Sequence, residues 1–264
     1  MKIGVDIGGS RIKAGIVDKN RIIKKIEVYT PKTRKEFLKK LVSVIKYLDS
    51  KKNNFIGVGC PGPADYKKGV IWKTPNVPLS NFNLLKFLKS KFKGKRIVID
   101  NDANCFVLGE ALKLKEKIVV GLTLGTGVGG GIVVNKKIFS GKGNAGELGR
   151  CIIEVNGITG KDKIKGSLEG YISGDAVKRN LGKTAQEMSD KEWGSYGMYV
   201  GIGLATLNNV LDPDIIVLGG GITRSYRKFE KSMKKELKKR SINKLPKIII
   251  GKEYSGIFGA ANLG

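Results

Sequence analysis

DIGGSRIKAGIV (residues 6–17) and LGTGVGGGIVV (residues 124–134) are two copies of one pattern, a strand that meets a glycine turn and continues as a second strand. Two such copies indicate an internal duplication, with one copy at the head of each of two lobes. Glycine lets the backbone approach a phosphate and direct successive N–H groups at it. The two turns therefore predict a clamp for a polyphosphate.

Strand and helix patterns alternate outward from both copies. Thr33 and Glu36 predict a capping box ahead of a helix whose apolar residues recur at helical spacing. Further helices are predicted at residues 82–92, 102–113, 168–181 and 196–211, and in a basic stretch ending near Arg240. Strands are predicted at residues 11–17, 22–29, 55–60, 97–99, 118–124 and 215–218. The alternation indicates an α/β protein with a mainly parallel sheet in each lobe.

The length of the chain sets the expected division into lobes. Its 264 residues suffice for two lobes of about 100–150 residues, each with its own core. We expect residues 1–112 to form the N-terminal lobe, joined by the C-terminal segment 251–264, and residues 113–250 to form the C-terminal lobe.

The composition argues against several classes of protein. No apolar run approaches the roughly 20 residues of a membrane span, so we expect no membrane partner. The N-terminus lacks a secretory apolar region, which predicts a cytoplasmic protein. The scattered cysteines, Cys60, Cys105 and Cys151, give neither a disulfide framework nor a metal motif. The net charge is +27, but the lysines lack interleaved aromatic residues, so a solvated basic surface is favoured over a nucleic-acid partner.

Three features predict nucleotide binding. VLGGGI at residues 217–222 takes a strand through three glycines toward a helix, as a loop that binds adenosine requires. Asp6 lies between its strand and the first glycine turn, where a carboxylate can hold Mg²⁺ through water. The predicted contacts with ATP are Asp6, Gly8, Gly9, Ser10, Lys13, Gly125, Thr126, Gly127, Gly219, Gly220 and Gly221.

The segment DNDAN at residues 100–104 carries the strongest sign of chemistry. Its polar residues stand at the end of a strand and the start of a helix, where sites gather in open α/β sheets. One such residue suffices to cap the helix, and capping leaves the others unexplained.

These motifs together resemble the ROK family (repressor, open reading frame, kinase) of sugar kinases in the actin-like ATPase superfamily. The resemblance spans nearly the whole chain and rests on motifs in the family's order: DIGGSRIKAGIV, GCPGP, TPNVP, DNDAN, TLGTGVGGGIV, GNAGELG, SLEGYISGDA, LDPDIIVLGGGI and GIFGAA. It implies a two-lobed actin-like (ribonuclease H-like) fold, with a duplicated mixed sheet flanked by helices and a central cleft. It also implies ATP as donor, a hexose as acceptor with glucose first, and a homodimer as one option.

The resemblance also assigns site residues. Asp102 matches the base that takes the proton from the attacking sugar hydroxyl. The sugar-binding set that the resemblance implies is Asn76, Asn101, Asp102, Glu147 and Glu169, with Arg150 beside them. Asn and Glu suit a polyhydroxyl ligand because they offer fixed donors and acceptors.

The chain departs from the family at its zinc motif. Many members hold a structural zinc with a His after the GELG motif and a CxCGxxGC cluster. This chain has Arg150 after GELG, no histidine, and only Cys151 between Arg150 and Glu169. A zinc site needs about four such ligands, so we expect no zinc. Because the missing His usually contacts the sugar, Arg150 leaves the identity of the sugar open.

Several alternatives remain from the sequence. The acceptor can be another hexose or an N-acetylhexosamine. The donor can be polyphosphate, because family members that use it also lack the zinc motif and their GGSxIK resembles residues 8–13. A sugar-responsive repressor would need an N-terminal helix-turn-helix, whereas the first phosphate strand here starts at Lys2. An inactive sugar-binding module would have no reason to retain Asp102.

Overall fold

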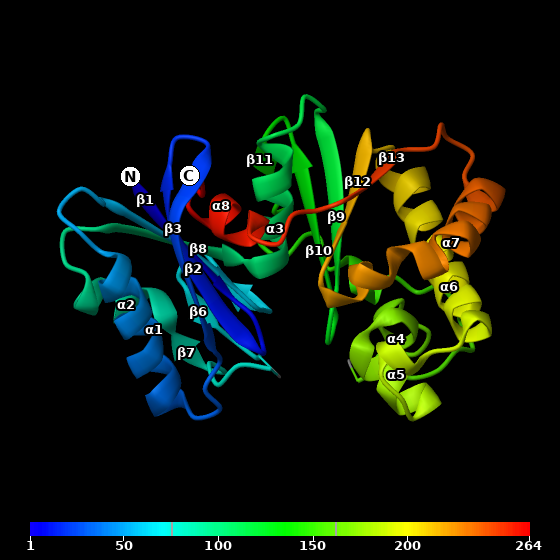
Figure 1. Ribbon diagram of the computed structural model, residues 1–264, viewed down its shortest axis with the longest axis horizontal. Helices are drawn as coiled ribbons and strands as arrows, with labels where there is room; N and C mark the ends of the chain where they lie inside the picture. The colour runs from blue at the N-terminus through cyan, green and yellow to red at the C-terminus, as the bar shows by residue number, and fades with distance from the viewer. Residues whose placement is uncertain (75, 162) are drawn as a thin grey trace. The chain divides into compact units, whose positions relative to one another are not determined.

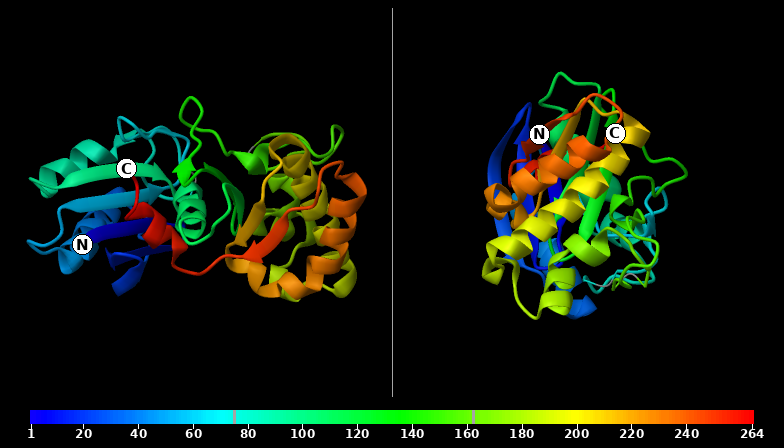
Figure 2. Two further views of the ribbon diagram at one scale, coloured as in Figure 1. Left: turned by 90° about the horizontal axis from the view of Figure 1, so that it is seen from above. Right: turned by 90° about the vertical axis from the view of Figure 1, so that its right-hand side faces the viewer.

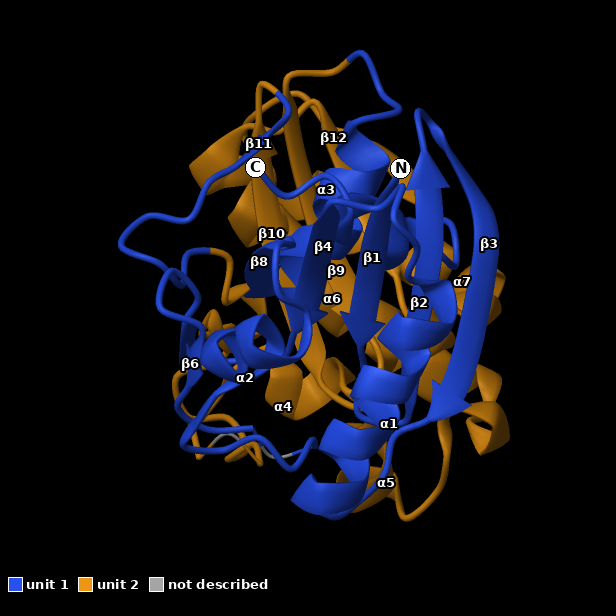
Figure 3. Cartoon of the chain, turned by 90° about the vertical axis from the view of Figure 1, so that its left-hand side faces the viewer, with its two compact units in different colours: residues 1–115, 136–145, 252–264 blue, residues 116–135, 146–251 orange. Residues whose placement is uncertain are grey.

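Two five-stranded sheets with the same strand order organise the computed structural model, which describes residues 1–74, 76–161 and 163–264 (Figure 1). The orders are β3-β2-β1-β4-β8 and β11-β10-β9-β12-β13. Residues 1–115, 136–145 and 252–264 form the first compact unit, and residues 116–135 and 146–251 form the second (Figure 3). The repeated order confirms the internal duplication and the α/β class.

The sheets are mixed, as the family resemblance implied, and not mainly parallel as the alternation of strands and helices had indicated. In the first sheet, β1 runs antiparallel to β2 and parallel to β4, and β2 runs antiparallel to β3. The strands of this sheet are β1 (Lys2–Ile7), β2 (Arg11–Asp18), β3 (Arg21–Tyr29), β4 (Phe55–Cys60) and β8 (Arg96–Asn101). Short turns cause the difference, because the glycine turn after β1 and the turn at Lys19 and Asn20 after β2 each return the chain antiparallel to the strand it leaves.

Helices and a small sheet complete the first unit. The helices are α1 (Arg34–Leu48), α2 (Leu84–Lys91), α3 (Asp102–Ala111) and α8 (Ser255–Ala260), and the small sheet has β5 (Ala64–Asp65), β6 (Val70–Ile71) and β7 (Phe82–Asn83). Thr33 caps α1 as predicted, but Glu36 contacts the Thr33 hydroxyl rather than the Thr33 backbone N–H that would complete a capping box. The Thr33 hydroxyl accepts from Glu36 N at 3.4 Å and lies 2.7 Å from Glu36 Oε2. One apolar stripe of α1, including Phe37 and Leu41, is buried in the core of this unit.

The second unit repeats the sheet and covers it with helices. Its strands are β9 (Ile118–Leu124), β10 (Val128–Val134), β12 (Ile215–Gly219) and β13 (Lys247–Ile250). The short β11 (Lys137–Ile138) follows β10 in the chain and falls in residues 136–145, which are counted with the first unit. Its helices are α4 (Glu169–Ile172), α5 (Gly174–Leu181), α6 (Asp190–Leu211) and α7 (Tyr226–Arg240). Helices α6 and α7 lie side by side (Figures 1 and 2). Between them Trp193 stacks on Phe229 with ring centroids 5.8 Å apart.

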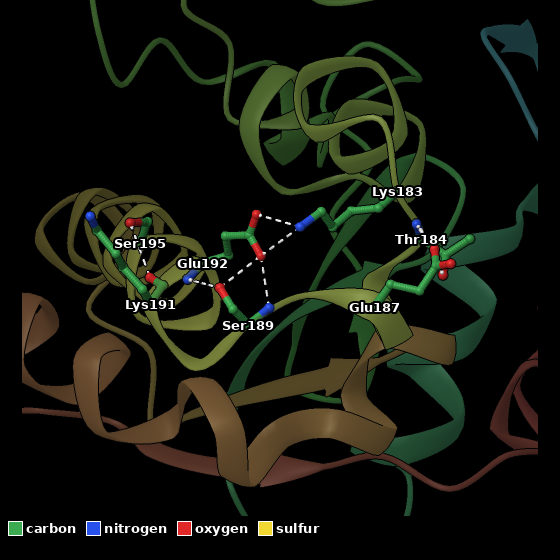
Figure 4. A network of polar contacts seen from close by, with 7 residues as sticks. All are labelled: Lys183, Thr184, Glu187, Ser189, Lys191, Glu192 and Ser195. Atoms are coloured by element: carbon green, nitrogen blue, oxygen red, sulfur yellow. Dashed lines mark hydrogen bonds and ion pairs between the residues drawn. The ribbon is translucent and has the colours of Figure 1, made fainter.

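Local polar contacts move two predicted helix boundaries. The helix expected at residues 168–181 is two helices, because Ser173 ends α4 and its side chain caps α5. Helix α6 starts before the predicted residue 196 because Ser189 and Glu192 form a capping box (Figure 4). Glu192 Oε2 accepts from Ser189 N at 2.7 Å, and Lys183 Nζ lies 2.9 Å from Oε1. The hydrogen bond from Ser189 N, helped by Lys183, lowers the pKa of Glu192 to about 2.

Glycines let α8 lie directly on the first sheet and on α3. A Cβ on Gly57 of β4 would stand 1.7 Å from Ala260 O, and one on Gly4 of β1 would stand 2.0 Å from Ile257 O. On the opposite side, a Cβ on Gly259 would stand 1.7 Å from Cys105 O of α3. No larger residue fits at these contacts without moving backbone. Every helix in the described part of the chain is too short or too polar to cross a lipid bilayer.

The backbone contact at Gly259 gives a stability prediction. Gly259→Ala forces a Cβ into the carbonyl of Cys105, so it should lower the free energy of unfolding by about 3 kcal/mol, the upper range of overpacking. Gly194→Ala is the matched control, because no atom lies within 4 Å of a Cβ at that helical position. The control should raise stability by about 0.5–1 kcal/mol. Urea denaturation measures both, and equal effects of the two changes would contradict the packing.

Candidate active site

The first predicted phosphate turn, between β1 and β2, is held in shape by Thr30. Gly8 N donates to Arg11 O at 2.9 Å and closes the turn. The hydroxyl of Thr30 donates to Gly8 O at 2.7 Å, and Thr30 N donates to Ser10 O at 3.0 Å. A Cβ on Gly9 would stand 2.8 Å from Cβ of Asn76. The structure therefore brings the predicted phosphate turn and the predicted sugar-binding Asn76 into contact.

Asp6 and Lys13 are direct neighbours across the β1–β2 pair. Burial raises the pKa of the Asp6 carboxyl to about 6, and the charge of Lys13 only partly opposes this. The first turn of α8 lies against the carboxylate, because a Cβ on Gly256 would stand 2.6 Å from Asp6 Oδ2. A poorly solvated carboxylate with one cationic neighbour fits the binding of a hydrated divalent cation, which would restore the lost solvation.

Within residues 1–74, 76–161 and 163–264, no three His, Cys, Asp or Glu side chains gather closely enough to hold a metal ion. A cation at Asp6 would accordingly take most of its ligands from water and phosphate. The expectation that the protein needs no zinc stays a prediction.

Asn101 supplies the helix cap at the β8–α3 junction. Its Oδ1 accepts from Ala103 N at 2.9 Å and from Asn104 N at 3.2 Å, and its Nδ2 donates to Tyr66 Oη at 3.1 Å. Asp100 accepts from Asn104 Nδ2 at 2.9 Å, and burial raises the pKa of Asp100. Asn101 is therefore a structural cap and the partner of Tyr66, whether or not it also contacts a sugar.

Asp102 is the first residue of α3 and is half-buried. The N-terminus of the helix favours a negative charge at this position. Strand β4 ends close by, because a Cβ on Gly59 would stand 3.2 Å from Asp102 Cα. Burial raises the pKa of the Cys60 thiol, and the charge of Asp102 raises it further. The charge of Asp102 therefore raises the pKa of the buried Cys60 thiol, whereas the cap of α3 is provided by Asn101.

In the second unit, the glycine turn between β9 and β10 is fixed by α4 and α5. Gly125 N donates to Gly127 O at 3.0 Å. Gly174 N donates to Gly125 O at 2.7 Å, and Glu169 Oε2 accepts from Val128 N at 2.8 Å. Asp175 N donates to the carbonyl of Thr126 at 3.1 Å. Glu169, predicted to contact the sugar, is thus placed against the predicted phosphate turn.

The third glycine loop packs directly behind the second turn. Gly219 ends β12 opposite Thr123 of β9. Gly220 has a φ of 89°, and a Cβ there would stand 2.3 Å from Leu124 O, so only glycine fits. A 3₁₀ turn, Gly221–Ser225, leads into α7. The two nucleotide elements predicted for the C-terminal lobe are therefore adjacent.

Glu147 and Arg150, both predicted beside the sugar, are paired with each other. Arg150 Nε lies 3.4 Å from Glu147 Oε2, and both side chains are about 40% exposed. Their 3₁₀ turn, Leu148–Arg150, lies on β10, because a Cβ on Gly149 would stand 2.5 Å from Val128 O. Val128 is also the residue whose N–H donates to Glu169 Oε2.

Hydrogen bonds hold the segment in which the zinc motif is missing. Tyr171 Oη accepts from Ile158 N at 3.0 Å and lies 3.4 Å from Glu154 Oε2. Ile152 and Ser167 form an isolated antiparallel β-bridge across the segment. Sequence reasoning missed Thr30, Tyr66 and Tyr171 as supports of the site, because each acts on a partner that only the fold brings close.

Comparisons with known proteins agree over the full chain. A profile of the ROK family matches residues 2–263. N-acetyl-D-glucosamine kinase of Photobacterium profundum is 31% identical over 306 aligned positions, which cover 100% of this chain and 99% of that protein. The ROK hexokinase of Thermus thermophilus superposes with a TM-score of 0.86 at 28% identity, covering 98% of this chain and 96% of that one. A ROK family glucokinase from Streptomyces griseus, solved with glucose and AMPPNP, gives 0.85 at 25% identity, covering 99% and 98%.

The raised pKa of Asp6 predicts a dependence of stability on pH. A carboxyl with a pKa of about 6 in the fold and 3.8 unfolded favours folding only while it is protonated. Stability should therefore fall as the pH rises from about 4 to about 6, by up to about 3 kcal/mol.

Asp6→Asn removes this titration, so without Mg²⁺ the variant should exceed the wild type in free energy of unfolding at pH 8 and approach it at pH 4. Urea denaturation across this range is the measurement. A variant that is less stable than the wild type at pH 8 would show that Asp6 is not held in a desolvated site.

Proposed function

This chain belongs to the ROK family, and we propose that it works as an ATP-dependent sugar kinase that phosphorylates a hexose hydroxyl, with glucose as the first candidate acceptor. The kinase activity is supported by full-length similarity to sugar kinases, in sequence and in fold. The observation that carries the catalytic assignment lies at the β8–α3 junction. Asn101 caps α3, so capping does not account for the carboxylate of Asp102.

Asp102 is the proposed general base. A hexose hydroxyl has to lose its proton as its oxygen attacks the terminal phosphorus of the donor. The carboxylate of Asp102 would accept that proton at the N-terminus of α3. Burial and the nearby charge of Asp102 keep the thiol of Cys60 protonated, so Cys60 does not compete as a base or nucleophile. Asn76, which touches the first glycine turn, would bind a neighbouring sugar hydroxyl.

The glycine elements are the proposed phosphate and adenosine contacts. In the second unit, Gly125–Gly127 and Gly219–Gly221 are held together by the packing of Gly220 on Leu124. In the first unit, Gly8, Gly9 and Ser10 form the turn braced by Thr30, with Lys13 on the adjoining strand. Asp6 would hold Mg²⁺ through water, and that ion would neutralise charge on the donor phosphates.

N-acetylglucosamine is the second candidate acceptor. It is favoured by the relative from Photobacterium profundum, which matches this chain from end to end and is named for that substrate. Arg150 stands where most family members have the His that contacts the sugar, so this position does not decide between the two acceptors. Its ion pair with Glu147 places a hydrogen-bond donor and an acceptor side by side there. A location in the cytoplasm and polyphosphate as an alternative donor stay predictions.

Asp102→Asn separates the base from a structural role. The change keeps size and hydrogen bonding but removes basicity. The kcat for sugar phosphorylation should fall by roughly 10²–10⁴, while sugar affinity and melting temperature change little. Steady-state kinetics, sugar titration and thermal melting make the three measurements.

Asn101→Ala, at the neighbouring position, is the control for loss of the helix cap. It removes the cap, so it should lower the free energy of unfolding by about 1–2 kcal/mol. If Asp102→Asn retained full turnover, or if it lowered stability as Asn101→Ala does, the catalytic assignment of Asp102 would fail.

A further inference from the structure

Lysines dominate the outer face of helix α7, with the exposed Arg227 at one edge of that face. Its buried residues Phe229, Met233 and Leu237 recur every four residues and define the side turned to the core. At 100° per residue, five exposed lysines occupy the opposite side. These residues, which we call the lysine stripe, are Lys228, Lys231, Lys235, Lys238 and Lys239. The stripe spans about 16 Å along the helix axis.

The acidic residues of α7 do not neutralise the lysine stripe. Glu230 pairs with Lys234 at 2.6 Å, and Glu236 pairs with Arg240 at 2.9 Å. At 100° per residue, Glu230 and Glu236 lie on the two flanks of the helix, between the stripe and the buried side. Within the described part of the chain, none of the five lysines pairs with a carboxylate. Five like charges on one face repel each other, so a partner of opposite charge would relieve that repulsion.

An exposed aliphatic cluster stands at the C-terminal end of the stripe. Ile242 is 88% exposed, Val210 is 74% exposed and Leu245 is 42% exposed. We call these three residues the apolar tip. Hydrogen bonds tie the segment after α7 to the end of α6. Ile242 N donates to Asn209 Oδ1 at 3.0 Å, and Asn209 Nδ2 donates to Arg240 O at 2.9 Å. Ile242 and Val210 are thus held near each other without being buried.

Two acidic residues, Asp212 and Asp214, closely follow Val210 in the chain, and both are exposed. Asp214 binds the start of β9 through Ile118 N at 2.9 Å and Lys117 N at 3.0 Å. Asp212 is exposed and ends α6. Lys244, which stands between Ile242 and Leu245 in the chain, adds a further exposed positive charge.

We propose that the lysine stripe and the apolar tip form a docking surface for a lipid bilayer that carries anionic headgroups. Lipid phosphates would meet the lysines, and Ile242 and Val210 would enter the boundary between headgroups and acyl chains. This departs from the expectation, drawn from the sequence, that the protein has no membrane partner.

Two other occupants fit less well. A second copy of this chain would bring the same stripe of positive charge to the interface, and the two stripes would repel. A nucleic acid would match the lysines, but the tip offers aliphatic side chains and no aromatic ring on which a base could stack. An anionic bilayer uses both the charge and the apolar tip.

Vesicle sedimentation of the full chain tests the proposal. The protein should bind vesicles of phosphatidylcholine mixed with phosphatidylglycerol at low salt, and should leave them at high salt or when phosphatidylglycerol is omitted. The triple variant Lys231→Gln, Lys235→Gln, Lys239→Gln should lower the vesicle partition coefficient by roughly 100-fold. Ile242→Ser should lower it independently.

The control removes the same charge elsewhere. Lys35→Gln, Lys39→Gln and Lys46→Gln on α1 also take three positive charges from an exposed helical face, and should leave vesicle binding near wild type. Sugar-dependent ATP turnover should be unchanged in both triple variants, and neither variant should melt at a lower temperature than the wild type, because both changes remove like charges from one helical face.

Three results would overturn the proposal: no binding to the anionic vesicles, equal losses in the two triple variants, or no effect of Ile242→Ser. Tighter binding of a single-stranded RNA oligonucleotide, lost in the α7 triple variant, would also overturn it and assign the stripe to nucleic acid.

Discussion

The close contact of α8 with its surroundings is the constraint on which the first unit depends. Backbone meets backbone on two sides of this short helix, and glycines at positions 4, 57 and 259 leave the room for it. The same helix sets Gly256 against the carboxylate of Asp6. The C-terminal part of α3 fixes the segment that leads into α8, because Glu110 accepts hydrogen bonds from Lys252 N and from the Ser255 hydroxyl. One packing contact therefore relates the proposed Mg²⁺ ligand to the helix that begins with Asp102.

The second unit has the same strand order as the first, but other contacts shape its glycine turn. Its glycine turn is shaped by main-chain and carboxylate contacts from α4 and α5, whereas Thr30 shapes the turn in the first unit. Gly220 then locks the third glycine loop onto the end of β9. Duplication thus supplied two phosphate-binding candidates on one scaffold, and only the second acquired a neighbouring loop suited to adenosine. The proposed adenosine contacts therefore belong to the second unit, whereas the proposed phosphate and sugar contacts come from both units.

Local patterns in the sequence were sufficient for much of the fold. Strand β4, Phe55–Cys60, matches its predicted bounds because it is apolar throughout and flanked by turn residues, and the helix cap at Thr33 involves only neighbours. Helix α8 and strand β13 were not predicted, because six and four residues carry too little periodicity. In the site, the DNDAN motif located the junction, but the bond between Asn101 and Tyr66 joins distant segments that only the fold brings together. The sequence could therefore name candidate residues, but not divide capping from catalysis among them.

Sugar-dependent formation of ADP tests the central claim most directly. Purified protein with Mg²⁺ would be assayed against glucose, other hexoses and N-acetylglucosamine, with ATP and polyphosphate supplied in parallel. The account predicts that ATP turnover rises when a sugar is added, that the product is a sugar phosphate, and that glucose or N-acetylglucosamine has the highest kcat/KM. ATP turnover that no sugar stimulates, or phosphorylation by polyphosphate with none by ATP, would contradict it.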